Sequence, residues 1–587
     1  MGSDTPAAVA PTTDQPRTET SPRQLTGGEA VVEMLHLHGV DHAFGMGGFQ
    51  PLPYYDALAR QSTIRHVLIR DEKHGAFAAD AFARVTNRPA VADATLGPGA
   101  TNLVSGAAES FGASVPVIFL TGDVNRSIAG RAATQESDQV GMLRPTMKQV
   151  VFIDLIERIP ELVRRAFAIA TSGRPGPVLI DIPEDVFHGI HDFTTADLYA
   201  DDATRAIASR RIRPDQATLE RAVELLAEAQ RPTAILGGGI HLSAAYGQVQ
   251  RLVDETGIPA ACTISGKGAL SDDHPLALGL CGRFSTIANE FVRDADLLLI
   301  VGCKLGEICT DRWKLIPPTT TVIQIDIDPL ELGKVYKTAV GLWGDAALTL
   351  DELVDALGDR ATLPLPNSKA RAEHVERARQ AWQLEARASY LSSESPTHVA
   401  RLLHELRQAL PAESIVVADG GFAAHWSALL LDIPVAGRHY IANRGHAAIG
   451  YGLPGALGAQ LAAPNLPVVA LCGDNGFAMA LAELETAKRE GLPITVIVVD
   501  NAALGYVKAL QHGLYDGRFI SADFLEIDYA DVARSLGCWG KRVEEPGDLA
   551  EALAEAVETD LPAVVDVVTT RDASKMLPGV DSRTRSA

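Results

Sequence analysis

The fold is decided by residues 468–477, which read Val468-Val469-Ala470-Leu471-Cys472-Gly473-Asp474-Asn475-Gly476-Phe477. A short apolar run, Val468–Leu471, leads into a Gly-Asp-Asn-Gly turn, and a helix is expected to begin near Ala480. Unbroken apolar runs of this kind are typical of strands in parallel sheets that helices cover on both faces. Such sheets bind ligands at the carboxyl ends of their strands, so the turn is a candidate site.

A second apolar strand is expected at residues 494–499, and it ends in Asp500-Asn501-Ala502-Ala503-Leu504-Gly505. This end offers an Asn side-chain oxygen and free backbone carbonyl groups. Because Asp474 and Asn501 each follow a parallel strand, their oxygens can meet on one octahedral Mg²⁺, with a diphosphate filling the remaining positions. Gly473 and Gly476 would let backbone N–H groups approach such an anion closely.

The same alternation of short apolar runs and helical patterns recurs along the chain and predicts an α/β protein of three doubly wound parallel-sheet domains. We expect these domains at residues 24–195, 215–360 and 396–575. Residues 361–395, rich in charge and Ala, are predicted to form a helical linker. Residues 1–23 are rich in Thr, Pro and Ala and are predicted to be a disordered tail.

Composition excludes several classes of protein. The 587 residues carry a net charge of −22, which argues against nucleic-acid and anionic-membrane partners, since both need a basic face. No apolar run approaches the roughly 18 residues of a membrane span. Six cysteines without a CxxC pair exclude a disulfide scaffold and a structural zinc site. With no signal peptide in the N-terminal residues, we expect a cytoplasmic enzyme.

Residues 473–474 and 500–501 resemble the thiamine diphosphate fingerprint, in which GDG is followed some 25 residues later by NN. Two departures are visible, since Asn475 replaces the third Gly and Asp500 replaces the first Asn. The resemblance extends from about Gln24 to Pro578 and is to the acetolactate synthase-like family. It rests on long matching stretches: Ala94–Gly106, Thr171–Val178, Asp181–Pro183 and Gly450–Ala456.

The resemblance implies a pyrimidine-binding domain, a central nucleotide-fold domain and a diphosphate-binding domain, in this order. In the last of these it implies Asp474, Asn501 and the Ala503 carbonyl as Mg²⁺ ligands. The Ala447 carbonyl would accept the 4′-amino proton of thiamine diphosphate, and Ile449 would be the wedge that folds the cofactor. The remaining residues implied to border the cofactor are Gly421, Phe422, Gly473, Asn475, Gly476 and Gly505.

In the first domain, Glu72 follows the predicted strand 66–69 and matches the Glu that hydrogen-bonds N1′ of the cofactor. A buried carboxyl with a raised pKa could relay a proton to that ring, which then deprotonates C2 of the thiazolium. On its own, however, Glu72 also fits a helix-start carboxylate stabilised by the helix dipole. Further residues expected in the reaction pocket are His74, Gln135, Lys148 and His446.

The predicted function is therefore a Mg²⁺- and thiamine diphosphate-dependent carboligation or cleavage of a 2-ketoacid, a small carbonyl substrate. Phe49 stands where a small residue is usual in the family, and Leu510 where anabolic acetolactate synthases carry a Trp. Both changes reshape the pocket and argue against a branched-chain biosynthetic role. A 2-ketoacid decarboxylase, a 2-hydroxyacyl lyase and a diketone hydrolase remain alternatives. A nicotinamide-binding oxidoreductase is disfavoured, since no GxGxxG opens a first βαβ unit. Intact Glu72, Asp474 and Asn501 argue against a non-catalytic homologue.

The family also implies two features that these motifs do not determine. Its central domain binds FAD in some members and ADP in others, and Gly237-Gly238-Gly239 after a predicted strand could meet a phosphate. Its active sites lie between the pyrimidine-binding domain of one subunit and the diphosphate-binding domain of another. We therefore expect a homodimer or homotetramer.

Overall fold

The computed structural model describes residues 22–578. Three six-stranded parallel sheets, each flanked by helices, follow one another along the chain and confirm the predicted α/β class. The predicted disordered tail lies outside the described residues up to residue 21, and strand β1 begins at Arg23. No helix among residues 22–578 combines the length and the apolar character needed to cross a membrane.

The N-terminal domain is built on a sheet of strand order β3-β2-β4-β5-β7-β6. A two-stranded antiparallel ribbon joins the domain's first and last strands. The strands are β1 (Arg23–Thr26), β2 (His42–Gly45), β3 (Arg65–Leu68), β4 (Ala90–Ala94), β5 (Val117–Asp123), β6 (Gln149–Phe152), β7 (Val178–Pro183) and β8 (Ile190–Phe193). The helices are α1 (Gly27–Leu37), α2 (Leu52–Ala59), α3 (Glu72–Thr86), α4 (Pro98–Asn102), α5 (Val104–Ala113), α6 (Gln139–Leu143), α7 (Ile159–Thr171) and α8 (Glu184–His188).

The central domain has the strand order β11-β10-β9-β12-β13-β14, and the helix α14 leads out of it. The strands are β9 (Pro232–Leu236), β10 (Ala260–Cys262), β11 (Ala277–Leu280), β12 (Leu297–Val301), β13 (Thr321–Asp326) and β14 (Val340–Trp343). The helices are α9 (Gln216–Glu228), α10 (Gly239–Ser243), α11 (Tyr246–Thr256), α12 (Ala288–Asp294), α13 (Ala346–Arg360) and α14 (Ser368–Tyr390).

The C-terminal domain repeats the sheet order of the N-terminal domain, as β16-β15-β17-β18-β20-β19. The strands are β15 (Ile415–Ala418), β16 (Tyr440–Ala442), β17 (Val468–Gly473), β18 (Thr495–Asp500), β19 (Trp539–Val543) and β20 (Ala563–Val568). The helices are α15 (Val399–Ala409), α16 (Phe422–Leu430), α17 (Gly452–Ala462), α18 (Asp474–Ala480), α19 (Glu483–Glu490), α20 (Gly505–Leu514), α21 (Tyr529–Ser535) and α22 (Leu549–Glu558).

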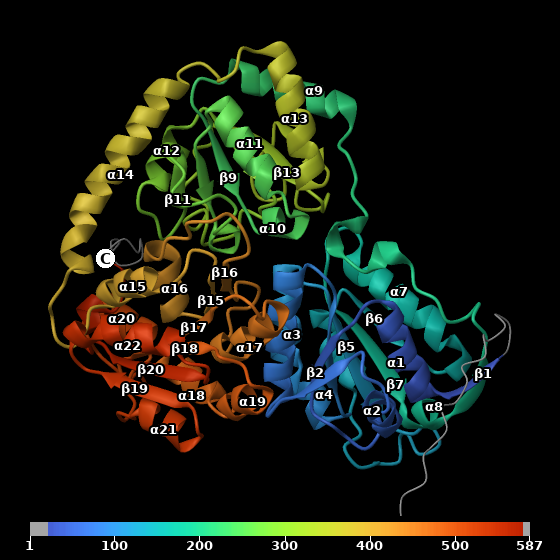
Figure 1. Ribbon diagram of the computed structural model, residues 1–587. Coiled ribbons are helices and arrows are strands. Elements are labelled where there is room, and N and C mark those ends of the chain that lie inside the picture. The colour runs from blue at the N-terminus through green and yellow to red at the C-terminus, as the bar shows by residue number, and fades with distance from the viewer. Residues whose placement is uncertain (1–21, 579–587) are drawn as a thin grey trace, which may run out of the picture.

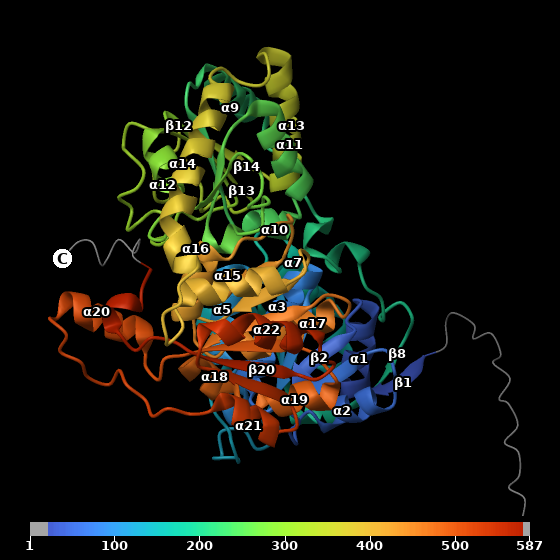
Figure 2. The ribbon, with the colours of Figure 1, turned by 60° about the vertical axis from the view of Figure 1, so that its left-hand side comes forward.

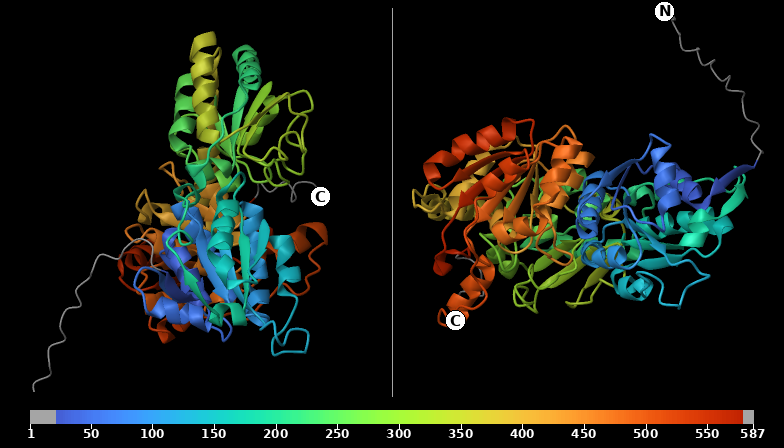
Figure 3. Two further views of the ribbon diagram at one scale, coloured as in Figure 1. Left: turned by 90° about the vertical axis from the view of Figure 1, so that its right-hand side faces the viewer. Right: turned by 90° about the horizontal axis from the view of Figure 1, so that it is seen from below.

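The three domains meet in a triangle, with the N-terminal and C-terminal domains side by side and the central domain above both (Figures 1 and 3). Helix α3 packs along α17, and Phe77 of α3 lies in the core of the C-terminal domain. The approach is close, since a Cβ at Gly458 of α17 would lie 1.9 Å from the Ala78 carbonyl oxygen of α3. The central domain connects to the C-terminal domain through the long helix α14 (Figure 1).

One local prediction is wrong. The helix after β17 begins at Asp474 and not near Ala480. The turn-forming residues Asp474, Asn475 and Gly476 thus form the first turn of α18, where a carboxylate is favoured by the helix dipole. This start brings the Asp474 carboxylate directly to the carboxyl end of β17.

Candidate active site at the carboxyl edge of the C-terminal sheet

The C-terminal sheet reverses its strand order between β15 and β17, because the chain adds β16 on one side and β18 on the other. Ligands of open α/β sheets bind outside such a switch point. The segment after β15 begins with Asp419-Gly420-Gly421, and the segment after β17 begins with Asp474. The fold therefore places two predicted cofactor segments on either side of one crevice.

Asp474 and Asn501 converge at this edge. The backbone N–H of Ala503 donates to Asp474 Oδ2 at 3.2 Å and to Asn501 Oδ1 at 3.1 Å, so both oxygens lie within reach of one atom. Both side chains are buried, and burial raises the pKa of Asp474 to about 6. A carboxylate oxygen and an amide oxygen brought together in this way are a donor set suited to Mg²⁺. A Cβ added at Gly473 would meet no described atom within 4 Å, which leaves room beside them.

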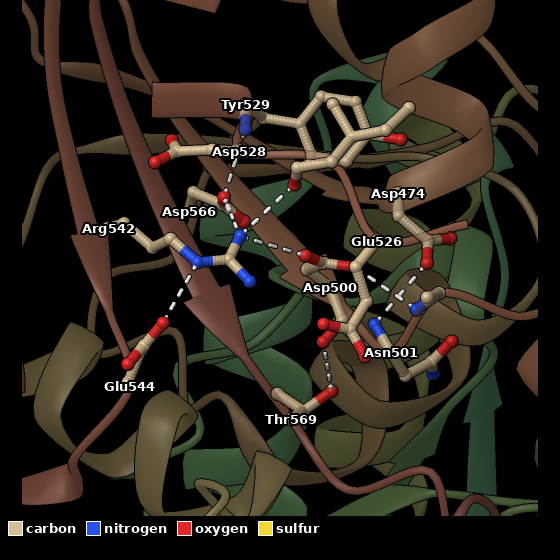
Figure 4. A network of polar contacts seen from close by, with 12 residues as sticks. Asp474, Asp500, Asn501, Glu526, Asp528, Tyr529, Arg542, Glu544, Asp566 and Thr569 are labelled. Atoms are coloured by element: carbon tan, nitrogen blue, oxygen red, sulfur yellow. Dashed lines mark hydrogen bonds and ion pairs between the residues drawn. The ribbon is translucent and has the colours of Figure 1, made fainter. Parts of the chain in front are cut away.

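Asp500 belongs to a charge network with Arg542 and Asp566 beside the pair (Figure 4). Its Oδ2 accepts from Arg542 Nη1 of β19 at 3.2 Å, and the same nitrogen donates to Asp566 of β20 at 2.6 Å. Asp500 Oδ1 accepts from the N–H of Ala502, whose φ is 47°. The Asp that departs from the NN pattern thus shapes the Asn501–Ala503 turn. Burial, with the nearby charge of Asp500, raises the pKa of Asp566 to about 7.

Asp419 was missed by the sequence analysis and connects two cofactor segments. Its buried carboxylate accepts from the N–H groups of Gly420, Gly450 and Tyr451 at 2.7, 3.0 and 3.0 Å. Burial raises its pKa to about 6. A carboxylate at the end of a predicted strand, before a Gly-Gly pair, was the signal that could have found it.

The other predicted cofactor residues of this domain gather around the same crevice. A Cβ at Gly421 would lie 3.9 Å from Ile449 Cγ2, and one at Gly420 would lie 2.7 Å from the Ala447 carbonyl oxygen. A Cβ at Gly505 would meet Asn501 Nδ2 at 2.8 Å and the ring of Phe422 at 3.1 Å. One site is therefore lined by residues from four segments: 420–422, 447–449, 473–476 and 501–505.

Glu72 starts α3 on the N-terminal domain. Its carboxylate is buried, accepts from Asn102 Nδ2 at 3.0 Å and lies against Gly99. The helix cap is supplied by Asp71, which accepts from the N–H of Lys73 at 2.8 Å. Within residues 22–578, no hydrogen bond or ion pair joins Glu72 to Asp474 or Asn501. Within one chain, the predicted cofactor residues of the C-terminal domain therefore lie together, whereas Glu72 makes no such contact with them.

The four remaining pocket candidates lie in different surroundings. His74 is buried between domains, where its Nδ1 lies 3.0 Å from Glu483 Oε1 of α19. Lys148 donates to the carbonyls of Ile169 and Ser172 at the end of α7, and burial together with Arg174 lowers its pKa to about 8. Two candidates have exposed side chains: Gln135 and His446.

The two residues that depart from acetolactate synthases also differ in their surroundings. Phe49 is 62% exposed on the loop after β2. Leu510 packs with Ala503, Ala509 and Met576, so α20 is tied to the segment that carries the Asn501 turn. The pocket-shaping role expected of Phe49 and Leu510 stays a prediction.

A cavity of about 420 Å³ lies at the junction of the three domains, at the switch point of the central sheet. Its walls include residues 237–239 after β9 and residues 302–304 after β12, with Arg438 and Arg444 from the C-terminal domain. Neither guanidinium forms a side-chain hydrogen bond or ion pair within the described part of the chain. Burial lowers the pKa of Arg438 to about 10 and, together with Arg174, that of Lys304 to about 8. This charge pattern suits an anionic ligand.

Comparison with known protein families identifies all three domains. Residues 25–142 match the model of the thiamine pyrophosphate enzyme N-terminal TPP binding domain, residues 219–353 the central domain, and residues 419–567 the C-terminal TPP binding domain. The chain belongs to the thiamine pyrophosphate enzymes. It is thus a thiamine diphosphate-dependent enzyme of the type that forms or cleaves carbon–carbon bonds, as the sequence predicts.

Curated relatives of this thiamine pyrophosphate enzyme match it almost end to end. The probable acetolactate synthase large subunit of Methanocaldococcus jannaschii is 35% identical over 95% of this chain and 93% of its own length. The acetolactate synthase large subunit of Parasynechococcus marenigrum is 34% identical over 93% and 88%. The acetolactate synthase isozyme 2 large subunit of Escherichia coli is 33% identical over 92% and 95%. The chain is therefore acetolactate synthase-like.

Proposed function

We propose that this enzyme is a Mg²⁺- and thiamine diphosphate-dependent carboligase that acts on a 2-ketoacid. The observation that carries the proposal is the convergence of the Asp474 and Asn501 oxygens at the switch point of a thiamine pyrophosphate-binding domain. The names of the relatives point to carboligation. The donor set fits the cation, because a hard cation prefers carboxylate and amide oxygens as ligands. A Cβ at Gly473 would meet no described atom within 4 Å, so the backbone at this position is open to an approaching anion.

In this proposal, Asp474, Asn501 and the Ala503 carbonyl hold Mg²⁺, and the backbone around Gly421 and Gly476 holds the diphosphate. Ile449 and the Ala447 carbonyl orient the aminopyrimidine. When bound, the thiazolium supplies an electron sink for the carbonyl carbon of the substrate.

Glu72 is assigned the proton chemistry. Its buried carboxyl would form a hydrogen bond with N1′ of the aminopyrimidine and would give or take a proton there. His74, Gln135, Lys148 and His446 are proposed as pocket residues. His74 contacts Glu483, and Lys148 donates to carbonyl groups at the end of α7. These contacts suit both residues to positioning the walls of the pocket.

The test is an anaerobic incubation of the purified enzyme with Mg²⁺, thiamine diphosphate and a panel of 2-ketoacids that includes pyruvate, followed by mass spectrometry of CO₂ and products. Acetolactate or a mixed acetohydroxyacid is the expected product. Release of an aldehyde alone would replace the proposal by a decarboxylase. Turnover of a 2-hydroxyacyl thioester alone would replace it by a lyase, and hydrolysis of a cyclic diketone by a hydrolase.

The site itself is tested by calorimetry. Asp474→Ala removes the anionic ligand of the cation, so Mg²⁺-dependent binding of thiamine diphosphate should be lost, and Asn501→Ala should weaken it less. Unchanged affinity in Asp474→Ala would contradict the assignment.

We also propose that the 420 Å³ cavity binds FAD or ADP. The unpaired guanidiniums of Arg438 and Arg444 and the ammonium of Lys304 support an anionic nucleotide there. Heat denaturation of the purified protein should release the nucleotide, and chromatography with absorbance at 450 nm distinguishes FAD from ADP. Release of neither, together with no binding of added FAD or ADP, would contradict the proposal.

The enzyme is proposed to act in the cytoplasm as a homodimer or homotetramer. All six cysteines are free thiols, and five of them are buried, which suits a reducing compartment. Fractionation of the cells that make the protein would test the location.

A further inference from the structure

A buried carboxylate of the N-terminal domain reaches the segment of the C-terminal domain that is proposed to orient the cofactor. Glu109 lies on α5 and is fully buried. Its Oε1 accepts from the N–H of Gly445 at 2.8 Å, and its Oε2 accepts from the N–H groups of His446 and Ala447 at 2.6 and 3.1 Å. Three consecutive backbone donors of the 445–447 loop therefore converge on one side chain.

The carboxylate is complete in its hydrogen bonding. Arg84 of α3 donates to Glu109 Oε1 at 2.9 Å, so the four donors fill the four acceptor sites of the ion. Arg84 also pairs with Asp80 at 2.6 Å, and Ser110 donates to the other oxygen of Asp80 at 2.8 Å. Charge-assisted hydrogen bonds of this kind are about twice as strong as neutral ones.

The loop needs such support at Ala447, whose φ is 59°. A residue with a Cβ disfavours the left-handed region, so the loop left to itself would relax toward another conformation. The backbones are also in close contact, since a Cβ at Gly445 would lie 2.0 Å from the Glu109 carbonyl oxygen. Ala448 and Ile449 follow directly, and Gly420 lies against the Ala447 and Ala448 carbonyl oxygens.

We propose that Glu109 is a positioning residue that holds the 445–447 loop, and through it the Ala447 carbonyl and the Ile449 side chain, in the conformation that binds thiamine diphosphate. The inference rests on the proposed function for its ligand, but its structural part, the conformation of the loop, does not. The N-terminal domain of a chain would in this way set the cofactor geometry of that chain's own C-terminal domain.

The experiment uses the full-length protein and four variants. Glu109→Gln removes the charge and replaces acceptors by an NH₂ group that faces N–H donors. Amide hydrogen exchange of residues 445–447 in the cofactor-free protein should accelerate at least tenfold. Calorimetry with Mg²⁺ and thiamine diphosphate should give about ten- to hundredfold weaker binding, since each charged hydrogen bond contributes about one to two powers of ten.

Ser110→Ala is the matched control, because it loses a hydrogen bond to the same Arg84–Asp80 network without touching the loop. It should stay within about twofold of wild type in both measurements. Ala447→Gly, placed in the Glu109→Gln background, removes the strain at φ 59° and should recover at least threefold in affinity. A residue that only joined the two domains would not be rescued by a change inside the loop.

Wild-type exchange at 445–447 in Glu109→Gln would overturn the inference, and so would a loss of affinity that Ala447→Gly does not recover. If Glu109→Gln does not fold, Glu109→Asp keeps the charge beside Arg84 but shortens the reach, and the same gain in exchange is expected. Failure of the wild-type protein to bind thiamine diphosphate would overturn the proposed function alone, because the exchange measurement still tests the loop.

Discussion

Glu72 is the residue at which two explanations make opposite predictions. As a helix-start carboxylate it would act only on the stability of α3, whereas as the partner of N1′ it acts on proton transfer. Glu72→Gln keeps the size and a hydrogen bond to Asn102 but removes the ionisable group. We expect a loss of turnover of roughly 10²–10⁴-fold, with cofactor affinity nearly unchanged. The measurements are steady-state turnover and C2 hydrogen–deuterium exchange of bound thiamine diphosphate.

The control for this prediction is the neighbouring carboxylate. Asp71→Asn retains the cap on the N–H of Lys73 and removes a charge at the same helix start. It should turn over within a few-fold of wild type. Equal behaviour of Glu72→Gln and Asp71→Asn would leave Glu72 without a catalytic role.

At the residue scale, the sequence predicted that two side chains lie close together where their positions at the ends of strands decide it. Asp474 and Asn501 could be placed together because both follow buried parallel strands. Glu109 could not, because its contacts lie 336–338 positions away and depend on how α5 meets the C-terminal domain. The available signal was a single carboxylate among small residues, in Ala107-Ala108-Glu109-Ser110. Small residues of this kind indicate a closely packed helix, and a Glu that is buried in such a helix is almost always paired with a donor or a positive charge.

At the scale of elements, Arg542 of β19 links the neighbouring strands β18 and β20 through ion pairs with Asp500 and Asp566. Its guanidinium neutralises Asp500 and Asp566, which are 3% and 0% exposed. Arg542→Met would leave two buried carboxylates without a counter-charge. We expect a destabilisation of about 3–5 kcal/mol, read as a lower midpoint of chemical denaturation.

The same network offers both a control and a rescue. Glu544→Gln removes an exposed partner of Arg542 and should change stability by less than about 1 kcal/mol. Arg542→Met combined with Asp566→Asn removes one of the two stranded charges and should recover part of the loss. An Arg542→Met variant as stable as wild type at pH 8, above the pKa of about 7 of Asp566, would contradict the role of Arg542 as the counter-charge of the two carboxylates.

His38 at the C-terminal end of α1 gives the fold a pH dependence. Its ring is buried, stacks on Phe167 at 4.1 Å, and its Nδ1 lies 2.7 Å from the Met34 carbonyl oxygen. Burial lowers its pKa from 6.5 to about 4. Between these values the unfolded chain binds the proton and the folded chain does not, so stability is lost as the pH falls from about 6.5 to 4.

The loss attributable to His38 is about 3 kcal/mol, from roughly 1.4 kcal/mol per pKa unit. His38→Asn keeps a donor for the Met34 carbonyl and does not titrate. The variant's thermal midpoint should therefore fall less than the wild type's over this pH interval. Parallel curves for the two proteins would contradict the shifted pKa.

Helices and strands were predictable where the hydrophobic pattern and the length of a segment indicated the same type of element. The continuous apolar runs at β12, β17 and β18 predicted parallel sheets correctly, because only strands buried on both faces lack alternation. The start of α18 was not predictable from Gly473-Asp474-Asn475-Gly476, because these residues favour turns locally and the helix is stabilised by packing of Phe477 and Ala480 in the core. The order of strands within each sheet is likewise a tertiary property.

At the scale of the whole molecule, the proposed catalytic residues lie on two domains: Glu72 on the N-terminal domain and Asp474 on the C-terminal domain. Within residues 22–578 no hydrogen bond or ion pair joins these two side chains. Helix α20 stands off the body of the chain (Figure 2), and the segment that follows exposes apolar side chains, among them Ile520 at 75% and Leu525 at 87%. Apolar side chains exposed together on one segment are typical of a surface that contacts another chain. We therefore expect a dimer, or a dimer of dimers, in which Glu72 of one subunit serves Asp474 of the other.

Two inactive variants distinguish this arrangement from a site within one chain. If Glu72 and Asp474 act across the interface, a mixed dimer of Glu72→Gln and Asp474→Ala subunits has one site with both changes and one site with neither. With equal co-expression, half of the dimers are mixed and half of their sites are intact, so activity should return to about one quarter of wild type. If each site lies within a chain, every site carries one change and no activity returns. Sedimentation velocity at micromolar concentration should show at least a dimer, and a fully active monomer would contradict the assembly outright.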